Sequence, residues 1–224
     1  TLRNYPLNCE SAEQIVRQIA DVEIDDKISF VIKKTEEIME DSEYQGVRLS
    51  LDAYLDKTRI PLKIDISTSD VITPCEISFS YQLMFENRTI PLLAYPPETV
   101  LAEKLETILS RGEANTRLRD FYDVYILQRE DFVVTPDALC HALLATCRKR
   151  GHEDLLQTYA SILDRVRQSD TMRTQWMKYQ SDFDYAAGIT WDTVLDTVET
   201  LCMKTLDDHA FGDELPQEES QFEM

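Results

Sequence analysis

The spacing of apolar positions changes near residue 95 from a period of two to a period of 3.6. Before that point a helical pattern over 11–20 precedes alternating segments that predict strands over 28–34, 46–55, 59–67, 77–85 and 89–94. We expect Ser11 to cap the helix, with Gln14 at the capping-box position. After Pro96 and Pro97 the pattern predicts helices over 98–111, 118–128, 136–150, 152–168, 171–179 and 190–206.

The predicted strands 46–55 and 59–67 are close enough in sequence to form a hairpin around residues 56–57. A two-residue turn would pair Leu49 with Ile64 and would place Arg48 opposite Asp65. A four-residue turn would keep the same faces and shift the partners, so both registers remain open. In the second strand, the face expected to be buried consists of Ile60, Leu62, Ile64 and Ile66.

The change in period divides the chain into three expected parts. Residues 1–95 should contain the sheet, residues 96–206 should form a helical domain, and the acidic residues 207–224 should be disordered because they offer little to bury. The predicted fold class is α+β, with a mixed or antiparallel sheet and flanking helices followed by a C-terminal helical domain. Residues expected to pack the last helices are Met172, Trp176, Met177 and Trp191.

Composition limits the classes of function. The chain has 23 Lys and Arg against 42 Asp and Glu, a formal net charge of −19, which argues against an extended basic groove for nucleic acid but allows a local basic pocket. Five scattered cysteines without a CxxC pair argue against a zinc site or a disulfide framework. No apolar run approaches membrane-spanning length and no signal peptide is present, so we expect a cytoplasmic protein without membrane contact.

The first candidate for chemistry is Asp65, on the polar face of the strand 59–67 beside Lys63. A carboxylate fixed on a strand suits Mg²⁺, because this hard cation prefers oxygen ligands in a strict geometry. The alternative is a cross-strand ion pair with Arg48, which is the commoner role of a lone aspartate on a strand.

The second candidate is Lys104, which lies on the apolar side of helix 98–111 near Leu101 and Ile108, with Glu106 pointing elsewhere. A lysine at such a position can extend along the apolar surface to water. It can also point its ammonium into a cleft, where it would bind phosphate as a point charge. The pattern leaves both interpretations open.

The third candidate is the pair Asp120 and Asp123, which are three residues apart and therefore on one side of their helix. An ion pair from Arg119 to Asp123 and the helix dipole would explain Asp123 well and Asp120 less well. Arg117 and Arg119 make this stretch locally basic, which would either steer phosphate or balance neighbouring acids. A lysine and paired acids on successive helices can hold a phosphate or a bound metal.

These segments resemble the AbiEii-type nucleotidyltransferase toxins of bacterial abortive-infection and toxin–antitoxin systems. Residues 63–67 (KIDIS) are similar to the run around the third aspartate of the family. Residues 102–104 (AEK) are similar to its Ala-Glu-Lys helix, and residues 117–124 (RLRDFYDV) to its Arg-x-Lys/Arg-Asp-x-x-Asp-Leu/Val element. The resemblance covers roughly residues 46–128, and the C-terminal helices follow it loosely. It implies a nucleotidyltransferase-like fold.

The resemblance also implies a Mg²⁺-dependent enzyme that transfers a nucleotide from a nucleoside triphosphate to an RNA, such as tRNA, or to a protein, with a cognate antitoxin among its partners. Asp65 would bind the metal, Lys104 would neutralise the triphosphate, and Asp120 would position the acceptor or orient the lysine. Residues expected to bind the nucleotide beside Lys104 are Lys63 and Arg117, and those expected to support the site are Arg119 and Asp123.

The chain departs from the family pattern before residue 65. In the family a Gly-Ser loop and an Asp-x-Asp pair come first, and no such motif occurs here; Asp25 and Asp26 follow no Gly-Ser. The sequence begins at Thr1, so we expect the pair to lie upstream or to be missing. In either case this chain alone should be inactive, because two of three metal carboxylates would be absent. The alternative is a non-catalytic acidic interaction module that keeps the fold without the chemistry.

Overall fold

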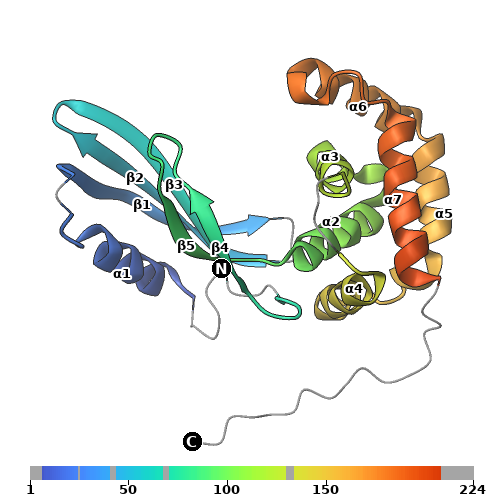
Figure 1. The fold of residues 1–224 in the computed structure, drawn as a ribbon, viewed down its shortest axis with the longest axis horizontal. Helices are drawn as coiled ribbons and strands as arrows, with labels where there is room; N and C mark the ends of the chain where they lie inside the picture. The colour runs from blue at the N-terminus through green and yellow to red at the C-terminus, as the bar shows by residue number, and fades with distance from the viewer. Residues whose placement is uncertain (1–6, 25, 41–43, 68–70, 130–133, 208–224) are drawn as a thin grey trace, which may run out of the picture. The chain divides into compact units, whose positions relative to one another are not determined.

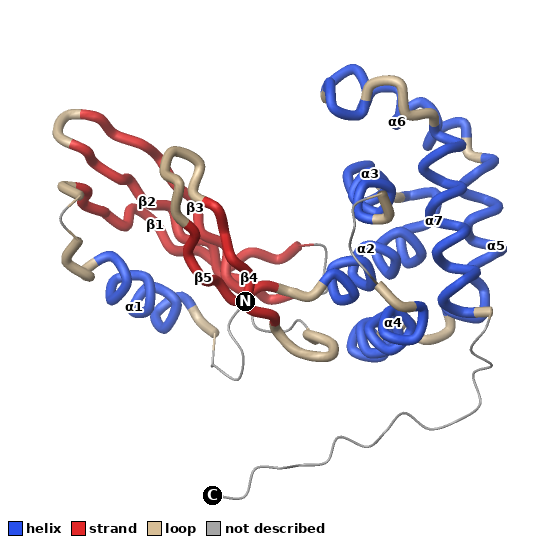
Figure 2. Tube along the Cα trace, viewed as in Figure 1, coloured by secondary structure: helices blue, strands red, loops and turns tan. Residues whose placement is uncertain are grey.

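The structure is a computed structural model that describes residues 7–24, 26–40, 44–67, 71–129 and 134–207. The described chain contains seven α-helices, two short 3-10 helices and five strands in two antiparallel sheets, which confirms the predicted α+β class. Figures 1 and 2 show these elements along the chain. The chain divides into two compact units, residues 1–70 and residues 71–224.

The first unit is a three-stranded antiparallel sheet with strand order β1-β2-β3 and one helix packed on it. Its elements are α1 (Cys9–Ala20), β1 (Ile28–Glu40), β2 (Tyr44–Leu55) and β3 (Thr58–Ser67). The Ser11 amide donates to Asn8 Oδ1 over 2.8 Å, and the Asn8 amide donates to Ser11 Oγ over 3.0 Å. Asn8 is therefore the cap, and our assignments of Ser11 and Gln14 are wrong because the helix begins two residues earlier than expected.

The hairpin between β2 and β3 has the two-residue turn, which confirms the first of the two registers. Leu49 pairs with Ile64, and Arg48 pairs with Asp65. Asp56 in the turn has a φ of 52°. Aspartate tolerates this left-handed conformation better than most residues, because its short side chain bonds to nearby backbone. The sequence thus places a suitable residue where the chain must reverse.

One face of this sheet is covered only in part. The core of the unit consists of Ala12, Val16, Val47, Leu49, Leu51 and Ile66. The helix packs mainly on β1 and β2, so the apolar side chains of β3 remain open: Ile60, Leu62 and Ile64 are 49%, 38% and 38% exposed. Our expectation that this face of β3 is buried is therefore wrong for these three residues and right for Ile66.

The second unit joins a two-stranded ribbon to a group of helices. Its main elements are β4 (Ile77–Gln82), β5 (Thr89–Ala94), α2 (Pro97–Arg111), α3 (Leu118–Leu127), α4 (Pro136–Arg150), α5 (Leu155–Gln168), α6 (Asp170–Asp182) and α7 (Trp191–Leu206), with 3-10 turns η1 (Gly112–Ala114) and η2 (Asp184–Ala186). The expected boundary between a sheet part and a helical part at residue 95 stays a prediction. The expected disordered tail, beyond Asp207, lies outside the described residues.

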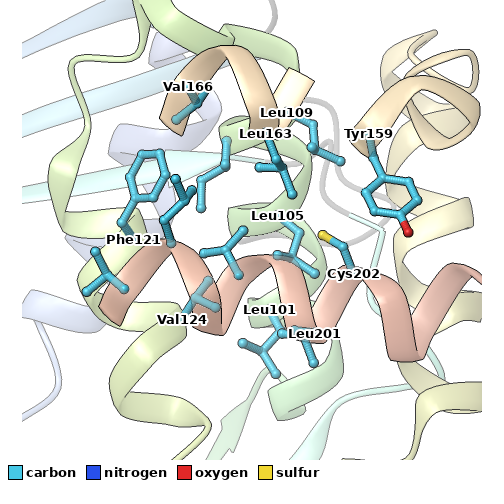
Figure 3. Packing of buried hydrophobic residues seen from close by; sticks show 14 of the residues in the cluster. Leu101, Leu105, Leu109, Phe121, Val124, Tyr159, Leu163, Val166, Leu201 and Cys202 are labelled. Atoms are coloured by element: carbon cyan, nitrogen blue, oxygen red, sulfur yellow. The ribbon is translucent and has the colours of Figure 1, made fainter. Parts of the chain in front are cut away.

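The helices share one continuous hydrophobic core (Figure 3). The core side chains labelled there come from α2, α3, α5 and α7, and are Leu101, Leu105, Leu109, Phe121, Val124, Tyr159, Leu163, Val166, Leu201 and Cys202. Trp176 and Trp191 lie in this core with ring centroids 6.0 Å apart, and Met172 is fully buried. Met177 is 61% exposed, so our expectation that it packs the helices is wrong.

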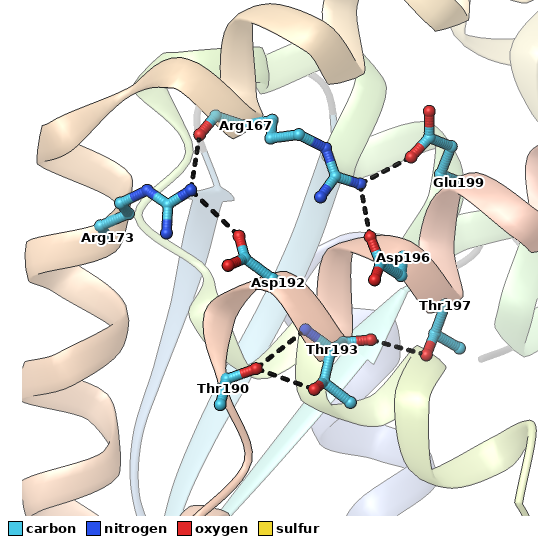
Figure 4. Close-up of polar contacts among 8 residues, drawn as sticks. All are labelled: Arg167, Arg173, Thr190, Asp192, Thr193, Asp196, Thr197 and Glu199. Atoms are coloured by element: carbon cyan, nitrogen blue, oxygen red, sulfur yellow. Dashed lines mark hydrogen bonds and ion pairs between the residues drawn. The ribbon is translucent and has the colours of Figure 1, made fainter.

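Ion pairs at the surface join α7 to the two helices before it (Figure 4). Arg167 of α5 lies 2.8 Å from Asp196 and 2.6 Å from Glu199. Arg173 of α6 lies 3.0 Å from Asp192. The pair Arg173–Asp192 links α6 to α7, and α6 in turn supplies one wall of the pocket described below.

Candidate functional site

A lysine and two aspartates from neighbouring helices form the centre of the candidate site. Lys104 of α2 places its Nζ atom 2.6 Å from Asp123 Oδ2 and 3.1 Å from Asp120 Oδ1, both on α3. The lysine side chain is 20% exposed, and those of Asp120 and Asp123 are 15% and 22% exposed. The ammonium is thus held between two carboxylates and does not extend along the surface into water.

Local helix geometry explains this arrangement. On α3, Asp120 precedes the buried Phe121 and Asp123 precedes the buried Val124, so both acids lie at the edge of the face that enters the core. The same relation holds on α2, where Lys104 precedes the buried Leu105. Packing of the two apolar faces therefore brings the lysine to the acids.

The acids keep the lysine charged. Burial lowers the pKa of Lys104, but the hydrogen bond to Asp123 and the charges of Asp120 and Asp123 outweigh burial and raise the pKa above its ordinary value. Arg119 Nε lies 3.7 Å from Asp123 Oδ2, which confirms the expected pair at i, i+4. An ammonium has three N–H donors, and the described carboxylates use two of them, which leaves one for a phosphate oxygen.

A pocket of about 540 Å³ lies beside Asp120, between the start of α3 and the later half of α6. Arg117, which precedes α3, and Arg119 of α3 line it on one side, and Lys178 of α6 lines it on the other. The lining also contains the carboxylates of Asp120 and Asp182, which leaves an excess of one positive charge in a chain of net charge −19. Sequence reasoning missed Gln175 and Lys178, although their spacing of three residues puts them on one side of α6.

Asp65 lies in the first unit and is paired with Arg48. The Arg48 guanidinium donates to both carboxylate oxygens of Asp65, each over 2.7 Å. These hydrogen bonds hold the pKa of Asp65 below its usual range, and the charge of Lys63 adds to the effect. The cross-strand ion pair is thus the interpretation that the geometry supports. The convergence of Asp65 with Lys104 stays a prediction, because the two residues belong to different units.

The described residues do not by themselves fit a metal centre. Within the described ranges no group of three or more His, Cys, Asp and Glu side chains is arranged to hold a metal ion. Asp65 offers one carboxylate, and Arg48 already occupies both of its oxygens. Since Mg²⁺ needs several oxygen ligands in octahedral geometry, we derive no reaction step through a metal.

A buried ion cluster on another side of α2 was not anticipated. The Glu106 side chain is fully buried, accepts a hydrogen bond from Arg150 at the end of α4, and lies 2.6 Å from Nδ1 of His152. The sequence indicated that Glu106 points away from Lys104, but a glutamate gives no sign of its own burial. This cluster ties α2 to α4 and thereby fixes the helix that carries Lys104.

None of the helices in the described part of the chain is long and apolar enough to cross a membrane. In a comparison with protein families, residues 9–197 match the family described as Nucleotidyl transferase AbiEii toxin, Type IV TA system. The matched region extends from α1 into α7 and includes Asp65, Lys104, Asp120 and Asp123. No curated protein and no solved structure matches the chain.

Proposed function

The chain belongs to the AbiEii nucleotidyl transferase toxin family of type IV toxin–antitoxin systems, and we propose that it transfers a nucleotide from a nucleoside triphosphate to an RNA or protein acceptor. The observation that carries this proposal is the contact of Lys104 with Asp120 and Asp123 beside a locally basic pocket. The cluster supplies a cation that is already oriented, and the neighbouring pocket, which Asp120 lines, has room for an anionic ligand.

Lys104 has the role of neutralising the triphosphate. Its ammonium is charged at neutral pH and only 20% exposed, so its attraction for phosphate is stronger than it would be in bulk water. Asp123 holds the lysine in place. Asp120 contacts both the lysine and the pocket, so it either orients Lys104 or positions the acceptor group.

Mg²⁺ is the cofactor that we propose for the complete site, where it would offset charge on the transferred phosphate. Asp65 is the described residue that would contribute to holding it, provided that the pair with Arg48 opens. The family's Asp-x-Asp pair has no counterpart among residues 1–64. We therefore infer that the chain by itself binds nucleotide but completes no transfer.

The partners follow from the family and from the site. We propose that RNA, such as tRNA, or a protein accepts the nucleotide in the cytoplasm, where nucleoside triphosphates are available, and that a cognate antitoxin opposes the activity. A non-catalytic acidic module is the second candidate. Two observations favour it: Arg48 forms hydrogen bonds with both carboxylate oxygens of Asp65, and the net charge of the chain is −19.

The test compares Lys104→Ala with the exposed control Lys149→Ala. We expect Lys104→Ala to weaken nucleoside triphosphate binding by about tenfold or more in calorimetric titrations, because one favourable charge contact is lost, while Lys149→Ala leaves binding unchanged. In a protein completed with the family's Gly-Ser and Asp-x-Asp segment, Lys104→Ala should abolish transfer of radiolabelled nucleotide. Unchanged binding and transfer in a folded Lys104→Ala protein would leave the lysine with a structural role only.

A further inference from the structure

Gln175, one of the residues that line the pocket beside Asp120, has a side-chain oxygen without a partner among the described residues. The Oε1 atom of Gln175 is shielded from solvent and accepts no hydrogen bond from the described residues. Gln180, on the same helix, differs, because its amide donates to the carbonyls of Ala186 over 3.2 Å and Ile189 over 2.9 Å. A buried acceptor is costly to leave unpaired, so the Gln175 amide is suited to a ligand that brings an N–H or O–H donor.

An exposed aromatic ring lines the same pocket. Phe183 is 41% exposed, yet it packs against Tyr179 with ring centroids 4.7 Å apart and against Tyr185 with centroids 5.3 Å apart and an interplanar angle of 29°. Its neighbours thus hold the ring in one orientation while part of its surface remains free. A fixed, open aromatic ring beside cationic side chains is the arrangement on which nucleobases stack.

Charge and size complete the description of the pocket. Arg117, Arg119 and Lys178 contribute cations to the lining, and Asp120 and Asp182 contribute carboxylates. Asp120 also contacts Lys104. The volume of about 540 Å³ falls within the range of roughly 300–1,000 Å³ that is usual for small-molecule sites. A flat ring, a hydrogen-bonding edge and a phosphate would each meet a matching group here.

We propose that this pocket is a nucleobase subsite, in which a base stacks on Phe183 and its edge hydrogen-bonds to the Gln175 amide while the cations bind its phosphate. The inference rests on the proposed function and deepens it, because it assigns recognition of the base to Gln175 of α6 and to Phe183 directly after it. The base belongs either to the nucleoside triphosphate or to the 3′ end of an RNA acceptor, since both present the same chemistry.

Calorimetric titration of the full chain tests the assignment with three probes: each of the four nucleoside triphosphates, inorganic triphosphate, and a short single-stranded RNA with a free 3′-hydroxyl. We expect Gln175→Ala and Phe183→Leu each to weaken binding of the base-containing probes by about tenfold and to leave binding of inorganic triphosphate unchanged. Gln157→Ala, which removes an exposed glutamine from α5, is the matched control. Weaker binding of the nucleoside triphosphates alone assigns the subsite to the donor nucleotide. Weaker binding of the RNA alone assigns it to the acceptor.

The comparison with Lys104→Ala separates this inference from the proposed function. Suppose that Lys104→Ala weakens binding of every triphosphate while the Gln175 and Phe183 variants bind as the wild type does. The proposed function then stands and the subsite is wrong, and water is the hydrogen-bond partner of the Gln175 amide. Gln175→Glu keeps the shape of the side chain and should change the ranking of the four bases, because it replaces a donor and an acceptor by two acceptors. An unchanged ranking in a folded Gln175→Glu protein would also overturn the assignment.

Discussion

Two charged clusters of this protein, the pair Arg48–Asp65 in the sheet unit and the groups around α2 in the helical unit, differ in how far water reaches them. In the sheet unit the pair Arg48 and Asp65 is 32% and 48% exposed, so water and salt reach both partners. In the helical unit Lys104 is 20% exposed between its two acids, and Glu106 is fully buried. The pair Arg48–Asp65 can therefore change partners at little cost, whereas the charges of Lys104 and Glu106 are part of the fold of the helical unit.

Removal of the most deeply buried charge should have the largest effect. Glu106→Ala removes the buried carboxylate that accepts a hydrogen bond from Arg150, whose side chain is 10% exposed. We expect a loss of about 3–5 kcal/mol in the free energy of unfolding, because breaking a buried ion pair by removing one partner is costly. Urea unfolding followed by circular dichroism measures it. Glu98→Ala in the same helix should change stability by no more than about 0.5 kcal/mol, and equal effects of both variants would contradict the comparison.

A smaller effect should follow removal of the half-buried lysine. Lys104→Met leaves Asp120 and Asp123 facing each other without their cation. We expect a loss of about 1–3 kcal/mol in the free energy of unfolding, less than for full burial because solvent reaches all three groups. The pKa of Lys104 is raised in the folded protein. The contribution of Lys104 to the free energy of unfolding is therefore complete below the ordinary lysine pKa of about 10.4, and it is lost only as pH rises through the raised value. The difference from wild type should therefore stay constant from neutral pH to about pH 9.

Helix capping offers a test that is confined to the sheet unit. Asn8→Ala removes the side-chain acceptor for the Ser11 amide and should destabilise the unit by about 1 kcal/mol. Hydrogen exchange should report the change as faster exchange in α1 and the strands, with α2 through α7 unaffected. Accelerated exchange in the helical unit would show that the two units unfold together.

The smallest effect is expected at the exposed pair. Arg48→Met should cost no more than about 1 kcal/mol, and the cost should fall as salt is added. The pKa of Asp65 should rise toward its ordinary value once the guanidinium is gone, which carboxyl carbon NMR can follow. Since Arg48 lowers the pKa of Asp65, the pair stabilises the fold above the ordinary pKa of about 3.9 and loses its contribution as pH falls through the lowered value. A large loss of stability of Arg48→Met at neutral pH would show that this pair, like the buried ones of the helical unit, is needed for the fold.

Sequence reasoning succeeded where one element determines the geometry. Alternation in phase on both sides of residues 56–57 gave the hairpin and two possible registers, one of which has Arg48 opposite Asp65 as observed. A spacing of three residues put Asp120 and Asp123 on one side of α3. It failed where the burial of a residue depends on how a second element packs on the first. Alternation tells which residues of β3 share a face, but the burial of that face depends on how far α1 extends over the sheet.

The pocket shows the same limit. Arg117 and Arg119 were identifiable from their own stretch, whereas Gln175 and Lys178 reach the pocket only through the packing of α6 on the rest of the helical core. Burial of Glu106 depends likewise on Arg150 at the end of α4. Long-range packing of this kind leaves no local signature in the pattern of apolar and polar positions.

The pairing order of the sheet has a consequence for the kinetics of folding. Strands β1, β2 and β3 pair only with neighbours along the chain, while the helical core requires α2 to meet α5 and α3 to meet α7 across long stretches of sequence. Local contacts close small loops and form fast, whereas distant ones form slowly. The unit with the smaller core should therefore appear first, and the strand that carries Asp65 would be in place before the helices assemble around Lys104.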